Sequence, residues 1–168
     1  IDALKKAGIK QTVMLAGDVK SVADKVASEL NIDQVYSELL PQDKVNKVEE
    51  LLSLKQSKEN LAFVGDGIND TPALSTADVS ISMQDSSDLA RELADITLVS
   101  SKLNELVILR RLAMNLFERI HANYRFIVAF NSSLIGLGAL GLMSPNTTSL
   151  LHNGSTFAIA ATSTRNYL

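Results

Sequence analysis

The fold of this chain is decided by residues 61–70, which read LAFVGDGIND. The first four form a short apolar run typical of a buried β-strand, and the two glycines let the backbone turn sharply where that strand ends. The turn presents Asp66 and Asp70 in the crevice where open α/β sheets hold their ligands. Two carboxylates there suit Mg²⁺, a hard cation that prefers oxygen ligands and usually shares them with a phosphate.

Asn69 adds an amide to this turn that can hydrogen-bond a phosphate oxygen or orient a carboxylate. An ordinary polar turn is the alternative interpretation, because Gly, Asn and Asp dominate turns for backbone reasons. The order of the six residues, after a strand and before the helix-like stretch 71–74, favours a site for Mg²⁺ and phosphate.

Strand-like and helix-like stretches alternate up to about Ser100. Short strands are predicted at residues 11–15, 34–37, 61–64, 79–83 and 96–99. Between them, apolar residues recur at helical spacing over 19–30, after Pro41 and over 87–94. Strands alternating with helices of this length indicate βαβ units, and therefore an α/β fold of Rossmann-like type with a parallel sheet.

Such connections are right-handed and place the strand ends along one rim, where we expect Asp18, Lys44 and Asp66. Asp18 has a second interpretation as a helix N-cap, because it precedes an apolar-periodic run. The second interpretation of Lys44 is an ordinary surface lysine exposed to solvent.

Three ordered motifs resemble the P-type ATPases, ion pumps whose phosphorylation domain belongs to the haloacid-dehalogenase superfamily. Residues 65–74, GDGINDTPAL, resemble the hinge motif of these pumps. Residues 14–18, MLAGD, are similar to the family's MLTGD, and residues 40–45, LPQDKV, to its LPxxKV. The resemblance covers essentially the whole chain and assigns residues 1–102 to part of the phosphorylation domain.

The resemblance implies ATP and Mg²⁺ as cofactors. Lys44, Asp66, Asn69 and Asp70 would be catalytic, with Asp66 and Asp70 holding Mg²⁺ and Lys44 neutralising the charge that builds up during phosphoryl transfer. The remaining residues of the nucleotide and phosphate site would be Gly17, Asp18, Gly65 and Gly67.

Two features depart from the family pattern. Ala16 stands where the superfamily has a hydroxyl that donates to the phosphoryl group. The family's phosphorylated aspartate lies in a DKTGT motif, which is absent from these 168 residues. We therefore expect the C-terminal part of a pump, inactive on its own because covalent phosphoryl transfer needs a nucleophile.

The composition of the chain argues against some classes of partner and ligand. The net charge of −3 gives no electrostatic reason to expect nucleic acid, and the chain has no cysteine for disulfides or thiolate metal ligands. No Asp, Glu, Lys or Arg occurs between Arg125 and Arg165.

This uncharged stretch suits two transmembrane helices within residues 125–168, joined by a turn at 144–148 and preceded by a connecting helix at 103–124. The alternative is a buried helical hairpin of a water-soluble protein. Arginines flank the stretch and none lies in the turn, so both chain ends and the phosphorylation domain would be cytoplasmic and the protein a multi-pass protein of the cell membrane.

Polar groups within a bilayer are candidates for function because they are costly there. Residues 152–156, HNGST, resemble a His-Glu-Gly-Ser/Gly-Thr motif of one heavy-metal branch of these pumps, with Asn153 in place of the Glu. His152, Ser155, Thr156 and Asn131 are accordingly predicted to contact the transported cation, and helix–helix hydrogen bonding is their alternative role.

The sequence thus predicts part of an ATP-driven pump for a divalent heavy-metal cation of the zinc, cadmium or cobalt type. Two other classes stay open: a soluble haloacid-dehalogenase-type phosphatase, which shares the hinge motif, and a non-catalytic fragment.

Overall fold

The computed structural model describes residues 1–65, 68–100 and 102–164. Two compact units make up the chain, Ile1–Val107 and Ile108–Leu168. The first contains the strands and the start of α6 (Asn104–Ala139), and the second contains the rest of a helical hairpin. Arg165, one of the charges behind the topology prediction, lies outside the described residues.

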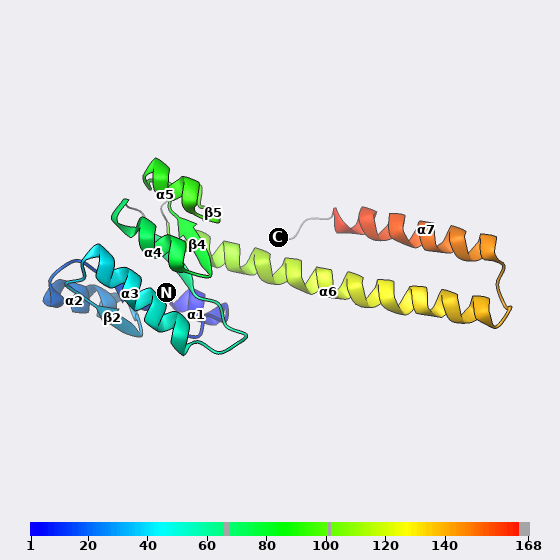
Figure 1. Cartoon of the computed structure of the whole chain (residues 1–168), viewed down its shortest axis with the longest axis horizontal. Helices are drawn as coiled ribbons and strands as arrows, with labels where there is room; N and C mark the ends of the chain where they lie inside the picture. The colour runs from blue at the N-terminus through cyan, green and yellow to red at the C-terminus, as the bar shows by residue number, and fades with distance from the viewer. Residues whose placement is uncertain (66–67, 101, 165–168) are drawn as a thin grey trace. The chain divides into compact units, whose positions relative to one another are not determined.

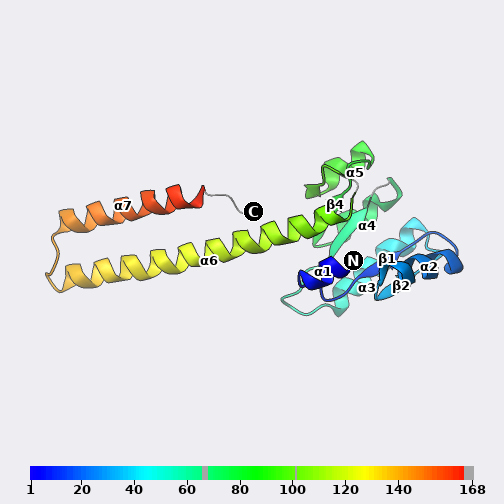
Figure 2. The same cartoon turned by 180° about the vertical axis from the view of Figure 1, so that it is seen from behind.

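Strands β1 (Val13–Leu15) and β2 (Gln34–Tyr36) form one parallel pair, with Met14 opposite Val35. They are joined by α2 (Lys20–Leu30), and β2 leads into α3 (Pro41–Leu54). Figure 2 shows β1 and β2 side by side. Pro41 opens α3, as predicted, because its fixed φ suits the first helical position.

A second parallel sheet has the order β3-β4-β5, formed by Ala62–Gly65, Val79–Ser82 and Ile96–Thr97. Between these strands lie the short helix η1 (Ile68–Asp70), α4 (Thr71–Thr76) and α5 (Asp88–Leu93). The predicted α/β class with parallel strands is confirmed. Within the described residues, however, the sheet is in two parts, so β1 and β3 are both edge strands.

The core of this unit lies where α4 contacts α3, α5, β3 and β4. Leu74 of α4 and Val48 of α3 are the largest apolar side chains that are fully buried. Burying a side chain of this kind contributes about 1.5–3 kcal/mol, so α4, which begins directly at the hinge sequence, is held firmly against its neighbours.

Two aspartates fix the ends of strands by accepting backbone hydrogen bonds. The backbone N–H and hydroxyl of Ser80 both donate to Asp95, at 2.9 and 2.8 Å, which lowers the pKa of that carboxyl. Lys55 and the backbone N–H of Leu61 donate to Asp78 and lower its pKa as well.

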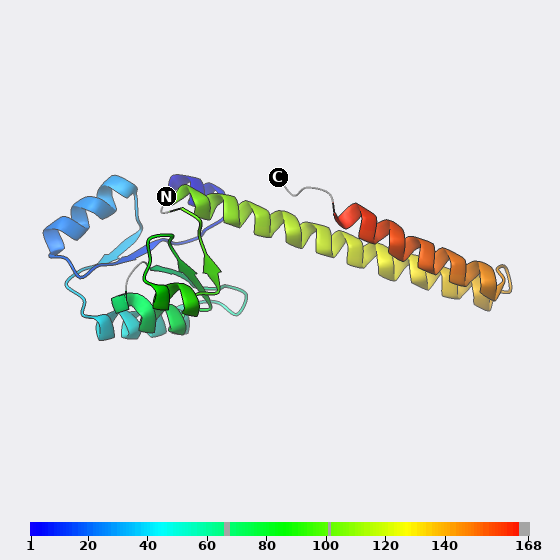
Figure 3. The same cartoon turned by 90° about the horizontal axis from the view of Figure 1, so that it is seen from above.

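The hairpin consists of α6 (Asn104–Ala139) and α7 (Pro145–Ser163). Figures 1 and 3, viewed from perpendicular directions, both show the two helices side by side. The sequence predicts a connecting helix followed by a separate apolar helix. The structure instead has one continuous helix, α6, because no proline interrupts it. Pro145 begins α7, so the turn lies before Pro145, whereas the sequence predicts it at residues 144–148. Gly141, at φ +69°, supplies the left-handed conformation that this turn needs.

Among the described residues, no helix is both long enough and apolar enough to cross a membrane. The predicted pair of transmembrane helices is therefore not supported, although the predicted helical hairpin is present. The physical reason lies in composition: α7 carries asparagines, serines and threonines along its length, which lower its mean hydropathy.

The carboxylate of Asp33 ties together three segments of the first unit. It accepts hydrogen bonds from Lys5 of α1 (Asp2–Lys6) at 2.6 Å and from the backbone N–H and hydroxyl of Thr12 at 2.8 Å. The Lys5 ammonium, followed by the Thr12 donors, lowers the pKa of Asp33 to about 2.

We predict that Asp33→Asn destabilises the chain at neutral pH, and that the difference from the parent narrows as the pH falls from about 4 to 2. The folded-state pKa is below the unfolded value of about 3.9, so the carboxylate's contribution is present above that value and lost as the pH falls through the folded pKa. Urea unfolding across this range measures it. Asp24→Asn, which removes only an exposed contact to Lys20, is the control; a constant difference for Asp33→Asn would contradict the prediction.

Candidate functional site

An ion pair between Lys44 and Asp70 forms the centre of the candidate site. The Lys44 ammonium donates to Oδ1 of Asp70 over 2.7 Å, and the two side chains are only 16% and 15% exposed. Lys44 is in the first turn of α3 and Asp70 ends η1. Because water is largely excluded, each charge depends on the other, and removing one partner from such a pair is strongly unfavourable.

Gly65 allows Asp70 to lie this close to the end of β3. A Cβ atom added to Gly65 would be 3.1 Å from Cβ of Asp70 and 3.1 Å from Cε1 of Phe63, which is tighter than nine in ten real Cβ contacts. A side chain at this position would therefore require Asp70 and Phe63 to shift.

The hydroxyl of Ser86 holds the same strand end from the other side. It is buried and donates to the carbonyl of Gly65 over 3.2 Å. Sequence reasoning missed Ser86, since a serine in a polar segment 21 residues away carries no local signal of this contact.

The loop after β1 is fastened to the loop before α3 by backbone hydrogen bonds. Ala16 donates to Tyr36 over 2.8 Å and accepts from Leu39 over 3.0 Å, while Glu38 donates to the carbonyl of Asp18 over 2.9 Å. The MLAGD segment thus lies beside the segment that leads to Lys44.

Asp18 itself is exposed, and its alternative interpretation as a helix cap is wrong. The N-cap of α2 is Val19, and no side chain caps that helix. Gly17 is exposed too, and a Cβ added to it would lie 3.4 Å from the Leu39 carbonyl. Ala16, in place of the family hydroxyl, is buried, with its backbone N–H committed to Tyr36.

Glu38 is a second residue that sequence reasoning missed. Its φ of +59° is in the left-handed region, which non-glycine residues rarely adopt. Such backbone strain persists only where the surroundings enforce it, and here the hydrogen bond to Asp18 is part of that constraint.

Asp66 and Gly67, both predicted site residues, lie outside the described residues. Of the others around the hinge, Asn69 is exposed, and the Thr71 hydroxyl is buried without a partner in the described part of the chain. Carboxylate, amide and hydroxyl oxygens are donors that fit Mg²⁺. No three His, Cys, Asp or Glu side chains among the described residues gather to hold a metal.

The predicted cation-site residues of the hairpin meet across its two helices. Nδ1 of His152 in α7 lies 2.9 Å from Oδ1 of Asn131 in α6. The hydroxyls of Ser155 and Thr156 donate to the backbone carbonyl of His152, over 2.7 and 3.1 Å. The structure thus joins His152 to Asn131 directly, whereas the two hydroxyl hydrogens are directed to the helix backbone.

A second polar contact between the helices lies further along. Nδ2 of Asn123 donates to the hydroxyl of Ser163 over 3.0 Å. We call Asn123, Asn131, His152 and Ser163 the polar seam. Large apolar side chains are instead exposed on the hairpin: Tyr124, Phe126, Ile127, Val128, Ile135, Leu150 and Phe157.

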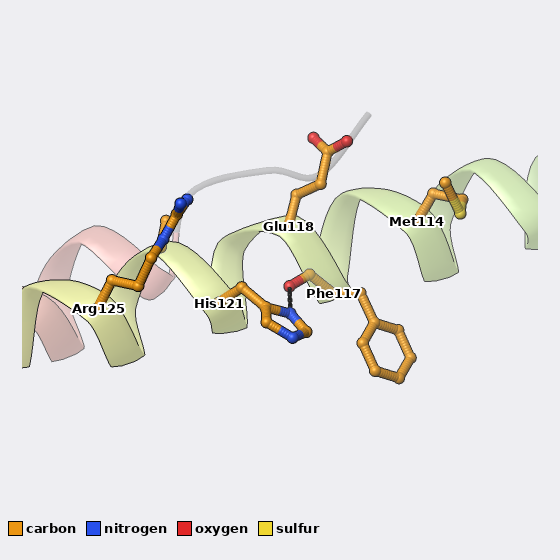
Figure 4. A pocket seen from close by; sticks show the side chains of 6 residues that line it. Met114, Phe117, Glu118, His121 and Arg125 are labelled. Carbon is orange, nitrogen blue, oxygen red and sulfur yellow. Dashed lines mark hydrogen bonds between the residues drawn. The ribbon is translucent and has the colours of Figure 1, made fainter. Parts of the chain in front are cut away.

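A shallow depression of about 460 Å³ lies on α6 and is lined by Met114, Phe117, Glu118, His121, Ala122 and Arg125. Figure 4 shows that its polar groups do not converge, since Glu118 and His121 point to opposite sides of the helix. Nδ1 of His121 faces the carbonyl of Phe117 at 2.8 Å. This arrangement does not resemble a catalytic or metal site.

The chain is similar to known proteins in sequence and in structure. Residues 1–78 match the family described as haloacid dehalogenase-like hydrolase. The manganese-exporting P-type ATPase of Mycobacterium leprae (strain TN) is 39% identical over 163 residues, 96% of this chain and 22% of that protein. The cadmium, zinc and cobalt-transporting ATPase of Bacillus subtilis (strain 168) is 43% identical over 140 residues, 83% of this chain and 20% of that protein.

The structural comparison extends over the same range. The crystal structure of a zinc-transporting PIB-type ATPase in the E2.Pi state matches with a TM-score of 0.87 and 33% identity, covering 96% of this chain and 26% of that one. This chain spans about a fifth of the length of the curated relatives it matches. Residues 1–78 are thus similar to haloacid dehalogenase-like hydrolases, and almost the whole chain is similar to one part of heavy-metal P-type ATPases.

Proposed function

We propose that this chain is part of an ATP-driven pump in the cell membrane that transports a divalent heavy-metal cation. The observation that carries the proposal is the ion pair between Lys44 of the LPQDKV sequence and Asp70 of the GDGIND sequence. This ion pair joins two motifs, and the MLAGD loop is hydrogen-bonded to the segment that precedes α3, which supports a shared role in phosphoryl transfer.

The phosphorylated aspartate of the pump would come from outside these 168 residues. Lys44 would neutralise charge on the phosphoryl group, since most of the catalysis of phosphoryl transfer consists of positioning and electrostatic stabilisation. Asp66 and Asp70 would hold Mg²⁺, which when bound neutralises phosphate oxygens and links them to the protein. Asn69 would orient these groups, and Gly17, Asp18, Gly65 and Gly67 would border ATP and its phosphates.

The hairpin would belong to the membrane domain, packed among further helices of the pump. The many large apolar side chains that are exposed on the hairpin support this. A hairpin surrounded by water normally buries such side chains, because apolar burial drives its packing. Neighbouring helices would cover the polar residues that lower the hydropathy of α7.

The transported cation would pass His152, with Asn131, Ser155 and Thr156 close by. Imidazole suits zinc and cobalt, and the similar proteins named above carry manganese, zinc, cadmium or cobalt in their names. A soluble phosphatase is the second candidate. The pump is favoured because the likeness to the zinc-transporting ATPase covers 96% of this chain and so includes most of the hairpin.

We predict that the isolated chain forms no phosphoenzyme with ATP, because it lacks the DKTGT nucleophile. Labelled ATP followed by acid precipitation measures this. Boiled chain serves as the blank, and acid-stable label above that blank would refute the assignment of the nucleophile to another segment.

In the complete pump, Lys44→Gln should slow phosphoenzyme formation about 10²–10³-fold, the typical cost of losing one group that stabilises transition-state charge. Lys44→Arg, which keeps the charge, should retain more activity, and Lys25→Gln on the exposed face of α2 should behave as the parent. Thermal unfolding of each variant separates a loss of rate from a loss of fold. A folded Lys44→Gln pump with the parental rate would contradict the role of Lys44.

The membrane position of the hairpin is tested with single cysteines in a cysteine-free pump, since this chain contributes none. Ile135→Cys should resist a membrane-impermeant maleimide in sealed vesicles and remain protected after the vesicles are opened. Val99→Cys, at a side chain 82% exposed in the first unit, should be labelled in opened vesicles. Equal labelling at both positions would place the hairpin in water.

A further inference from the structure

We propose that Asn131 is a positioning residue that fixes the tautomer of His152, so that Nε2 of the imidazole is presented as the metal-binding atom. This inference deepens the proposed function and rests on it for the identity of the ligand, a divalent cation of the zinc type. It assigns Asn131 a role that acts through His152, in place of the independent cation contact predicted from the sequence.

The direction of the hydrogen bond follows from the chemistry of the two groups. Oδ1 of Asn131 is a carbonyl oxygen, which only accepts, so Nδ1 of His152 at 2.9 Å must donate. A neutral imidazole carries one ring proton. With that proton on Nδ1, Nε2 keeps its lone pair, and no hydrogen-bond partner of Nε2 occurs among the residues that the structure describes.

This geometry is that of a histidine prepared for a metal. Metal-binding histidines almost always donate their second ring N–H to a carboxylate or carbonyl, which fixes both tautomer and ring orientation. Here the acceptor comes from the other helix, 21 residues away in sequence. The orientation of the imidazole therefore depends on the register between α6 and α7.

Two other polar contacts of the hairpin, Asn123–Ser163 and His121–Phe117, lack this combination. The Asn123–Ser163 contact joins the helices through groups that bind zinc-type cations weakly. His121 faces the carbonyl of Phe117 in its own helix, so its tautomer needs no second helix. Both provide controls within the same chain.

The tautomer is measured directly by nitrogen NMR of the full chain in detergent, with ¹⁵N-labelled histidine. The chain has two histidines, so His121 is an internal reference. Spectra are recorded without metal or nucleotide at about pH 9, where an ordinary imidazole is neutral. The parent is compared with Asn131→Leu, which removes the acceptor, Asn131→Asp, which keeps one, and Asn123→Leu, the same change at the other asparagine of the polar seam.

We expect His152 of the parent to be protonated at Nδ1, and to remain so in Asn131→Asp and Asn123→Leu. In Asn131→Leu the Nδ1–H preference of His152 should be lost while the His121 signals stay unchanged. Protonation of His152 at Nε2 in the parent, or the same tautomer in the parent and Asn131→Leu, would overturn the inference.

The consequence for transport is measured in the complete pump with Zn²⁺ as the probe. Asn131→Leu should raise the KM for Zn²⁺ stimulation of ATPase activity about 10–100-fold, the usual effect of removing such a partner. Asn131→Asp should restore most of the affinity, and Asn123→Leu should not change it. An unchanged KM in Asn131→Leu, in a pump where His152→Ala abolishes stimulation, would overturn the positioning role and leave the proposed function standing.

The NMR measurement also separates the tautomer hypothesis from the transport hypothesis in the case where only the transport hypothesis fails. If the tautomer responds as expected but His152→Ala leaves Zn²⁺ stimulation intact, the transport assignment of His152 fails, while the control of its tautomer by Asn131 is retained.

Discussion

The ion pair between Lys44 and Asp70 is the interaction on which the rest of the candidate site depends. Both charges are largely withdrawn from water, and leaving either one alone in such a position typically costs about 3–5 kcal/mol. The pair therefore couples the start of α3 to the end of β3. Gly65 provides the space, Ser86 anchors the strand end, and the loop around Glu38 links the same region to the segment after β1.

Much of this unit could be predicted from the sequence, because strands and helices carry their own periodicity and Pro41 and the hinge glycines mark boundaries. The pairing of Lys44 with Asp70 joins residues 26 apart, and only the expectation of a shared rim pointed to it. Ser86 and Glu38 escaped prediction for a different reason. A buried hydroxyl contact and a left-handed φ are imposed by tertiary neighbours, and neither residue type signals them locally.

The hairpin, too, could be predicted from the sequence only in part. Counting charges predicted two helices and a turn, and the helices exist, but charge counts ignore where asparagine, serine and threonine lie around the helix. Several of these residues are in the polar seam and others are spread along α7, so neither helix is apolar enough by itself to cross a membrane. The meaning of such residues depends on what surrounds the hairpin, which a single segment does not specify.

The division of the sheet into two parts has a consequence for handling the chain. Within the described residues, β1 and β3 each pair with one strand, so each leaves a row of backbone donors and acceptors along its other edge. Open edges of this kind are templates for any extended segment, and those segments include the edges of other copies. We therefore expect the 168-residue chain to self-associate through its strands at high concentration, and a peptide that pairs with an open edge to reduce this association.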